Sequence, residues 1–416
     1  MTAPCLVLVL LLAAPRVLTL DEALESAAQR QPQLRQAKAT LDVSRARADE
    51  ARSGLLPQVS GNASYGLGTT NIGGQVPYSL APGNSFNVGL SVNQLVYDFG
   101  RTTGQWNAAK ATSVAQEFGE KTTGAQVRLA VRSAFFSARA NKALLVVAQE
   151  TLANQERHLT QIQGYVEVGT RPGIDLAQAR TDRANARVQV VNAENGYESA
   201  KALLNQAMGI EGPTDYDVAD SPLSTVEGEE STTDALLEEA LAARPEFGTL
   251  SNQLRAQELT QGAIRGGYFP ILGVTAAASE GGHDNGLAPN WNAGLTLSWP
   301  LYQGGLTGAQ EREAAATLSS LKAQVDLARQ QVRLEVEQAR LAVRAAKASL
   351  LANVEAVVNA KERLRLAEGR YQTGIGNSLE LSDAQLSLSS VEAQTVQADF
   401  NLSSARAQLL KALGRP

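Results

Sequence analysis

The chain has 416 residues, which is too long for one small compact core. Aromatic residues make up only 5% of it, and long stretches rich in Ala, Leu, Gln, Glu and Arg indicate extended helices rather than ordinary globular packing. The formal net charge of −5 excludes the strong basic field that nucleic-acid binding requires.

The N-terminus carries an apolar run, Leu6 to Ala14 (LVLVLLLAA), of signal-peptide length. We expect residues 1–17 to be a signal peptide cut near Ala14 to Val17, with a buried N-terminal helix as the alternative. Cys5 is the single cysteine and precedes this run, so its removal leaves no disulfide. No other segment has about 18 consecutive apolar residues, so any membrane-spanning part has to consist of strands.

Two copies of one unit follow. One constant separation relates Pro32 to Pro245 and Leu56-Pro57 to Phe269-Pro270, and a slightly shorter one relates Gly100 to Gly305 and Met208-Gly209 to Leu413-Gly414. The sequence predicts a first repeat at 18–210, an acidic equatorial connector at 211–233 and a second repeat at 234–416. The connector contains no Lys or Arg and is expected to be solvated, and a binding role for it is less favoured.

Each repeat is predicted to contain two strands, at about 56–67 and 86–97 and at about 269–279 and 291–302. Their residues alternate with a period of two; Phe86, Val88, Leu90 and Val92, for example, alternate with Asn87, Gly89 and Ser91. This pattern is typical of a lipid-facing strand around a wet lumen, and a soluble sandwich is the alternative. The segment Gly66 to Ser85 suits a long extracellular loop.

Long helices follow the strands. Thr307 to Gly369 contains no proline and would extend about 95 Å, and Thr102 to Gln163 is its first-half counterpart. Small apolar residues at spacings of three and four form a seam for a neighbouring helix. The seam consists of Val332, Val336, Ala339, Val343, Ala346, Leu350, Val354 and Val357.

Four strands cannot close a barrel, because outer-membrane barrels begin at about eight. An open sheet in lipid would leave unpaired backbone groups at both edges. Several chains must therefore share one barrel, and counting alone allows two protomers or three.

The ordered motifs LLPQVSGNASY and YFPILGVTAAAS, LVYDFGR and PLYQGG, and YVEVGTRPGIDLAQA and YQTGIGNSLELSDAQ resemble the TolC family of outer-membrane efflux proteins. The resemblance covers about Leu20 to Gly414. It implies a mixed, mostly α fold, in which long antiparallel helical hairpins form a periplasmic α-barrel and each chain adds four strands to a shared 12-stranded transmembrane β-barrel. It also implies a homotrimer in outer-membrane lipid that works as the exit duct of an efflux or type I secretion system. Its partners would be a periplasmic adaptor protein and an inner-membrane pump.

The resemblance places the helix-to-helix turns at the periplasmic tip, where they would contact the adaptor. The turn residues are Tyr165, Gly169, Arg171, Gly173, Tyr371, Gly374 and Gly376. Glu380 and Asp383 match the acidic positions that line the narrowest point, and Asp175 is their first-half companion. Helix N-terminal charges favoured by the dipole are the alternative interpretation of the acidic pair. Gly376 stands where some relatives carry a latching arginine, whereas Arg171 and Asp175 retain latch-like residues.

No catalytic constellation is visible, so we expect no enzyme, cofactor or metal site. His158 and His283 are the only histidines and lie in different kinds of element. GxSxG, phosphate-loop and HExxH motifs are absent. The alternative function is a periplasmic adaptor of the same kind of pump, which would need one hairpin rather than two.

Overall fold

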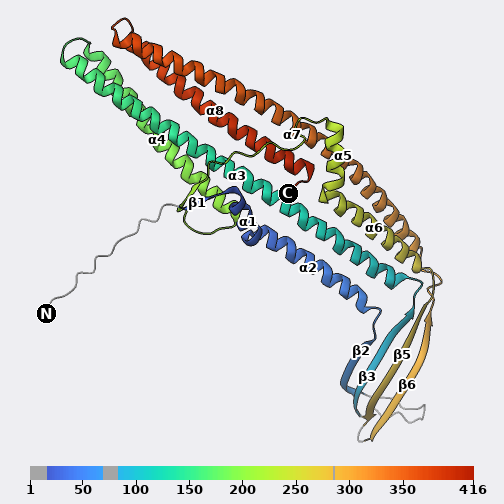
Figure 1. The fold of residues 1–416 in the computed structure, drawn as a ribbon. Coiled ribbons are helices and arrows are strands. Elements are labelled where there is room, and N and C mark those ends of the chain that lie inside the picture. Colours follow the sequence, from blue (N-terminus) through green and yellow to red (C-terminus); the bar gives the residue numbers. More distant parts are fainter. Residues whose placement is uncertain (1–15, 69–82, 284–285) are drawn as a thin grey trace, which may run out of the picture. The chain divides into compact units, whose positions relative to one another are not determined.

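The structure is a computed structural model that describes residues 16–68, 83–283 and 286–416 (Figure 1). Most of the expected signal peptide, including Cys5, and most of the expected extracellular loop lie outside the described residues. The chain divides into two compact units. The first combines the residues up to Ala37 with Lys121–Pro245 and Arg329–Pro416, and the second combines Lys38–Glu120 with Glu246–Ala328.

The internal repeat is confirmed by helices of equal length. Of the short helices, α1 (Leu20–Arg30) and α5 (Thr233–Ala243) have 11 residues each, and α2 (Pro32–Ser53) and α6 (Pro245–Gly266) have 22 each. Of the long helices, α3 (Arg101–Glu167) and α7 (Leu306–Gln372) have 67 each, and α4 (Gly173–Met208) and α8 (Ser378–Leu413) have 36 each. Pro32 and Pro245 begin α2 and α6, where the missing N–H of proline costs nothing. No helix within the described ranges is both long and apolar enough to cross a lipid bilayer.

The second unit contains one antiparallel sheet with the strand order β2-β3-β5-β6 (Figure 1). The strands are β2 (Gln58–Gly68), β3 (Gly83–Tyr97), β5 (Ile271–His283) and β6 (Gly286–Ser298). Within the described part of the chain, β2 and β6 each pair on one side only. Both outer edges of the sheet therefore keep unpaired backbone groups in this single chain.

The pairing register separates the side chains of the sheet by polarity. Val59 lies opposite Val92, and Val274 opposite Leu295, so apolar residues share one face. That face is open: Trp291 is 80% exposed and Leu295 is 74% exposed. The alternation predicted from the sequence is thereby confirmed.

Small polar side chains occupy the other face and bond across strands. The hydroxyls of Ser60 and Ser91 are 2.8 Å apart, and Asn62 Nδ2 donates to Asn87 Oδ1 at 3.3 Å. These bonds satisfy part of the hydrogen-bonding capacity of the polar face. A sheet with this division suits lipid on one side and water on the other.

Aromatic residues gather where the strands give way to helices. Tyr97 meets Phe99 edge-on at 4.8 Å between ring centroids, and Phe99 stacks on Phe269 at 4.7 Å. Trp299 Nε1 donates to the carbonyl of Tyr268 at 3.1 Å. Amphipathic rings at one end of an apolar sheet are typical of a membrane–water interface.

The first unit contains two helical hairpins, α3 with α4 and α7 with α8 (Figure 1). One core is formed by Val131, Phe135, Phe136, Leu204 and Val218, which are fully buried or nearly so. The predicted seam on α7 is correct from Val332 to Val343 but wrong at Val354, which is 49% exposed. The buried positions Ala360 and Ala367 lie four and five heptads after Val332, so the heptad register continues along α7 and the predicted step from Leu350 to Val354 missed it by one residue.

The acidic connector is packed in part rather than solvated throughout, which corrects the sequence-based expectation. Its strand β4 (Tyr216–Val218) pairs in parallel with β1 (Arg16–Leu18), and Val218 is fully buried. Asp217 accepts from Lys142 Nζ at 2.6 Å and from the Tyr197 hydroxyl at 2.7 Å. Glu229 is buried and paired with Arg406 at 3.0 Å. The cations absent from the connector come from helices distant in the sequence.

Candidate functional site

One tight turn joins the two helices of each hairpin. Gly169 and Gly374 have φ angles of 75° and 81°, a left-handed backbone that glycine adopts without strain. Gly173 and Gly376 have no such angle, and Gly173 begins α4 as an ordinary helical residue. The two turns thus share a backbone plan built on one glycine each.

Arg171 of the first turn reaches across to the second turn. Its Nη2 donates to the carbonyls of Tyr371 and Gly376 at 3.3 and 3.4 Å, and its guanidinium lies 4.5 Å from the centroid of the Tyr371 ring. Gly376 packs so closely that a Cβ there would lie 3.0 Å from the Tyr371 nitrogen. We call this contact the Arg171 clamp; it ties one hairpin to the other.

Tyr371 is the centre of the small core beneath the turns and is only 2% exposed. Its ring meets His158 at 5.6 Å and Tyr165 at 6.5 Å, and Ile162 and Leu381 pack around it. Burial raises the pKa of Tyr371, and its hydroxyl has no hydrogen-bond partner. Of the predicted turn residues, Tyr165, Arg171, Tyr371 and Gly376 are therefore brought together.

The predicted acidic residues lie at the starts of α4 and α8. Asp175 accepts from Ser378 Oγ at 3.1 Å, which joins the two helix starts. The Glu380 carboxylate lies 3.4 Å from Arg370 Nη1. The backbone N–H of Glu380 donates to Asn377 Oδ1 at 2.7 Å, so Asn377 is the residue that caps α8. Asp383 is exposed one turn further along α8. Glu380 and Asp383 thus follow one another on the same helix, as the sequence predicts.

Asp182 was missed by the sequence reasoning. It lines a groove of about 290 Å³ between α4 and α8 together with Asp383, and it accepts from Ser382 Oγ at 3.3 Å. Asp182 stands seven residues after Asp175 on α4, which is two helical turns on the same face. That spacing was the signal that could have identified it.

Buried polar pairs continue away from the turns between α3 and α8. Gln155 Nε2 donates to Gln385 Oε1 at 3.0 Å, and the hydroxyls of Thr151 and Ser389 are 2.9 Å apart. Gln155 and Gln385 are each 8% exposed. Near the turns the hairpins therefore meet through buried polar pairs as well as through the small apolar core around Tyr371.

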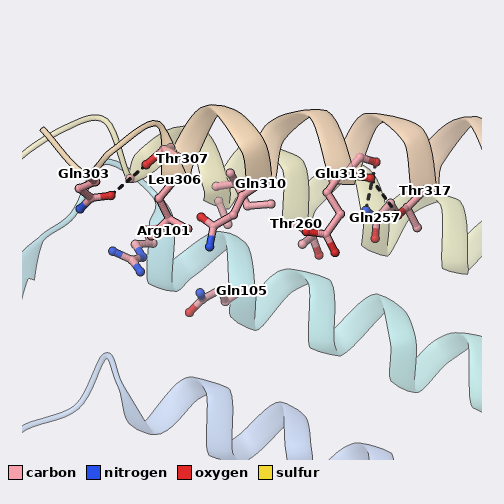
Figure 2. A pocket seen from close by; sticks show the side chains of 14 residues that line it. Arg101, Gln105, Gln257, Thr260, Gln303, Leu306, Thr307, Gln310, Glu313 and Thr317 are labelled. Carbon is pink, nitrogen blue, oxygen red and sulfur yellow. Dashed lines mark hydrogen bonds between the residues drawn. The ribbon is translucent and has the colours of Figure 1, made fainter.

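A larger hollow of about 490 Å³ lies in the second unit between the first turns of α3 and α7, with α6 behind it (Figure 2). Thr307 Oγ1 donates to Gln303 Oε1 at 3.1 Å, and Gln257 Nε2 donates to the carbonyl of Ala314 at 3.2 Å. Arg101 and Glu313 are its only charged lining residues. Among the described residues, no His, Cys or Lys lines this hollow.

Metal ligands do not cluster within the described residues: no group of three or more His, Cys, Asp or Glu side chains there could hold an ion. The geometry of both units is that of surfaces, turns and helix contacts.

The family model of outer membrane efflux proteins matches residues 23–210 and again residues 236–415. The chain belongs to this outer membrane efflux protein family. The two matches fall on the two repeats.

Relatives of known assignment agree with the family. Over 395 residues the chain is 27% identical to the toluene efflux pump outer membrane protein TtgF of Pseudomonas putida, covering 92% of this chain and 80% of that protein. It is 24% identical to the outer membrane efflux protein BepC of Brucella suis, covering 88% and 78%.

Solved structures share the fold. The Campylobacter jejuni CmeC outer membrane channel superposes with a TM-score of 0.84 at 18% identity, covering 95% of this chain and 85% of that one. The outer membrane protein VceC of Vibrio cholerae gives a TM-score of 0.81 at 18% identity, covering 95% and 96%. The protein is thus an outer-membrane exit duct of an efflux system in a Gram-negative bacterium, with a large periplasmic helical part. The alternative of a periplasmic adaptor is set aside.

Proposed function

We propose that three copies of the chain form the duct by sharing one 12-stranded sheet in the outer membrane. The observation that carries this proposal is the four-stranded sheet, which has an open apolar face and two edges unpaired in the described chain. Unpaired backbone groups in lipid cost several kcal/mol each. Pairing β2 of one copy with β6 of the next removes both edges from every copy.

Exposed aliphatic residues along α7 support the same assembly. Leu327, Leu334 and Leu341 recur every seven residues and are 65%, 49% and 47% exposed in the single chain. A heptad stripe of this kind fits a neighbouring helix. A trimer covers it and brings the long helices of three copies together.

The turns are the proposed docking surface for a periplasmic adaptor of an inner-membrane pump. Val168 and Ile174 of the first turn are 72% and 75% exposed, and Ile375 and Leu379 of the second are 77% and 66% exposed. Four aliphatic side chains in water at the ends of two hairpins favour contact with an apolar partner surface, such as the end of an adaptor hairpin.

The resting entrance is proposed to be closed at Asp175, Glu380 and Asp383. In a trimer, Glu380 and Asp383 would form acidic rings that favour cations. The Arg171 clamp holds α7 and α8 of each chain against α3 and α4, and adaptor binding at the turns would release it. No reaction is involved: the protein is a passive conduit, and an enzymatic role is not proposed.

The signal peptide is proposed to end before Arg16. Arg16–Leu18 forms β1 and pairs with β4, so a cut after Val17 would remove two residues of a paired strand. Sequencing of the N-terminus of the exported protein tests this cleavage site.

Single-channel currents in planar bilayers test the closed entrance. We expect small, cation-preferring currents from the wild type, and larger or less selective currents from Glu380→Gln/Asp383→Asn. Asp49→Asn/Glu50→Gln on α2 is the matched control and should behave as wild type. Currents unchanged by the gate variant would move the constriction elsewhere, and a native mass other than three chains would reject the trimer.

A further inference from the structure

His158 is a buried titratable group that the proposed gate does not use. It lies on α3 below the first turn and is 5% exposed. Its ring contacts that of Tyr371 on α7 at 5.6 Å, so it stands where the two hairpins meet. A cavity of about 280 Å³ opens beside it. The cavity lining is Asn154, Arg157, His158, Gln161, Glu368, Tyr371, Gln372, Leu381 and Gln385.

Charged groups face His158 from several elements. On α3 its neighbour is Arg157, and on α7 Glu368 lines the same cavity. On α4, Asp182 and Asp175 act on it electrostatically, and α8 presents the neutral Gln385 and Leu381. The Arg171 guanidinium lies against the Tyr371 ring that His158 also contacts.

We propose that His158 is a proton switch that loosens the contact between the two hairpins in acid, an inference that rests on the proposed duct and adds a regulation to its entrance. When α7 and α8 part from α3 and α4, His158 loses its Tyr371 contact and reaches water through the widened cavity. Protonation then stabilises the parted arrangement. A cation at His158 also adds positive charge next to the Arg171 clamp.

The direction of the effect follows from burial. Burial lowers the pKa of His158, and Asp182 and Asp175 oppose this only in part. In the parted state a hydrated imidazole has its ordinary pKa of about 6.5. Above a pH of about 6.5, protonation of His158 therefore does not oppose the contact between the hairpins. As the pH falls from about 6.5 towards the lowered pKa, protonation weakens this contact progressively. Each pH unit between the two pKa values shifts the equilibrium from packed to parted hairpins by up to about tenfold per histidine.

The two histidines of the chain offer a matched test. Single-channel currents are recorded from the full-length protein at pH 7.5 and pH 5.5, where carboxylates near their ordinary pKa values of about 4 keep their charge. We expect the open fraction of the wild type to rise in acid, by up to about tenfold per histidine. His158→Gln, which resembles the buried Gln155 and Gln385 nearby, should abolish the rise, whereas His283→Gln at the end of β5 should keep it. An equal rise in His158→Gln, or no rise in the wild type, would overturn the switch.

A second measurement follows the hairpins without current. Spin labels on Glu167→Cys at the end of α3 and on Thr373→Cys directly after α7, both exposed positions, report the distance between the hairpins in chains diluted with unlabelled protein. The distance should lengthen between pH 7.5 and 5.5 with His158 present and stay constant with His158→Gln. A constant distance in both overturns the switch even if the variant conducts poorly. A pH-dependent distance in protein that forms no channel would keep the switch and reject the duct.

Discussion

The residues that follow α1 and α5 occupy equivalent positions of the two repeats. Each binds the last turn of a long helix, α4 or α8, but with a different side chain. Gln31 Nε2 donates to the carbonyl of Ala207 at 2.8 Å in the first repeat. In the second, Arg244 Nε donates to the carbonyl of Ala412 at 2.7 Å and its Nη2 also pairs with Glu335 at 2.7 Å. The neutral amide bonds only to carbonyls at the end of α4, whereas the guanidinium adds a third helix, α7, to the contact.

The two turns differ in a comparable way. Arg171 and Gly376 occupy equivalent positions of the repeats, and the first supplies a cation while the second supplies a carbonyl and close packing. The two turns thus keep the same backbone plan, while their residues make different contributions to the contact between the hairpins. Neither turn could make the Arg171 clamp with a partner identical to itself.

The largest expected effect is the loss of Arg244. Arg244→Ala leaves Glu335 with Lys411 as its remaining cation and should destabilise the end of α8 by about 3 kcal/mol, the lower end of the cost of breaking a buried pair. Gln31→Ala should cost only about 1 kcal/mol at the end of α4. Hydrogen exchange of the last turns of α4 and α8 measures both. Arg333→Ala, which breaks the exposed pair with Asp234, is the control and should change little.

Acid should weaken the contact of Arg244 with α7 and α8, because this contact depends on the charge of Glu335. Burial acts to raise the pKa of Glu335, but hydrogen bonds from Arg244, Gln331 and Lys411 outweigh it and bring the pKa to about 2. Because the pKa is depressed in the fold, this stabilisation is present above the ordinary value and is lost as the pH falls towards 2. The unfolding midpoint of the wild type should fall more steeply below pH 4.5 than that of Glu335→Gln. Parallel curves for the two proteins would contradict the assignment.

Removing the Arg171 clamp should change gating more than stability. Arg171→Ala deletes two charge-assisted hydrogen bonds and a ring contact and should raise the open fraction about tenfold, or about 1.4 kcal/mol. Arg171→Lys should not restore the wild-type value, because an ammonium cannot make the same planar contacts. Gly376→Ala should act in the same direction but less, since its Cβ has to displace backbone 3.0 to 3.1 Å away. Single-channel recordings provide the comparison, and an unchanged Arg171→Ala channel would exclude the clamp from gating.

The smallest effect is expected at the helix starts next to the turns. Asn377 caps α8 by accepting from the Glu380 N–H, whereas Pro172 before α4 offers no side-chain bond. Asn377→Ala should therefore destabilise the first turn of α8 by about 1 kcal/mol, and Asn377→Asp should not. Hydrogen exchange at Glu380 tests this, with equal protection in both variants arguing against the cap.

Local patterns in the sequence were sufficient to predict much of the fold. Strand alternation, the absence of proline from the long helices and the glycine turns all depend on neighbouring residues, and they correspond to the sheet, to α3 and α7 and to the turns at Gly169 and Gly374. The same periodicity failed at Val354, because alternating steps of three and four can be continued in more than one way and the buried positions keep the heptad register to Ala360 and Ala367.

Contacts between distant segments could not be predicted in this way. The carboxylates of the connector looked solvated because their partners, Lys142 and Arg406, lie on helices far along the chain. The contact of Arg171 with Gly376 likewise depends on how two hairpins meet. Only the residue types at such positions were visible in the sequence, and not their partners.

The equal lengths of α3 and α7 restrict how the chain can tolerate insertions. One extra residue in α3 advances everything beyond it by about 1.5 Å and rotates it by about 100°. Gln155 would then no longer meet Gln385, and Arg171 would miss the carbonyl of Gly376. A viable change of length in one long helix therefore demands the same change in the other, so the reach of this duct towards its pump can be altered only in matched, paired steps.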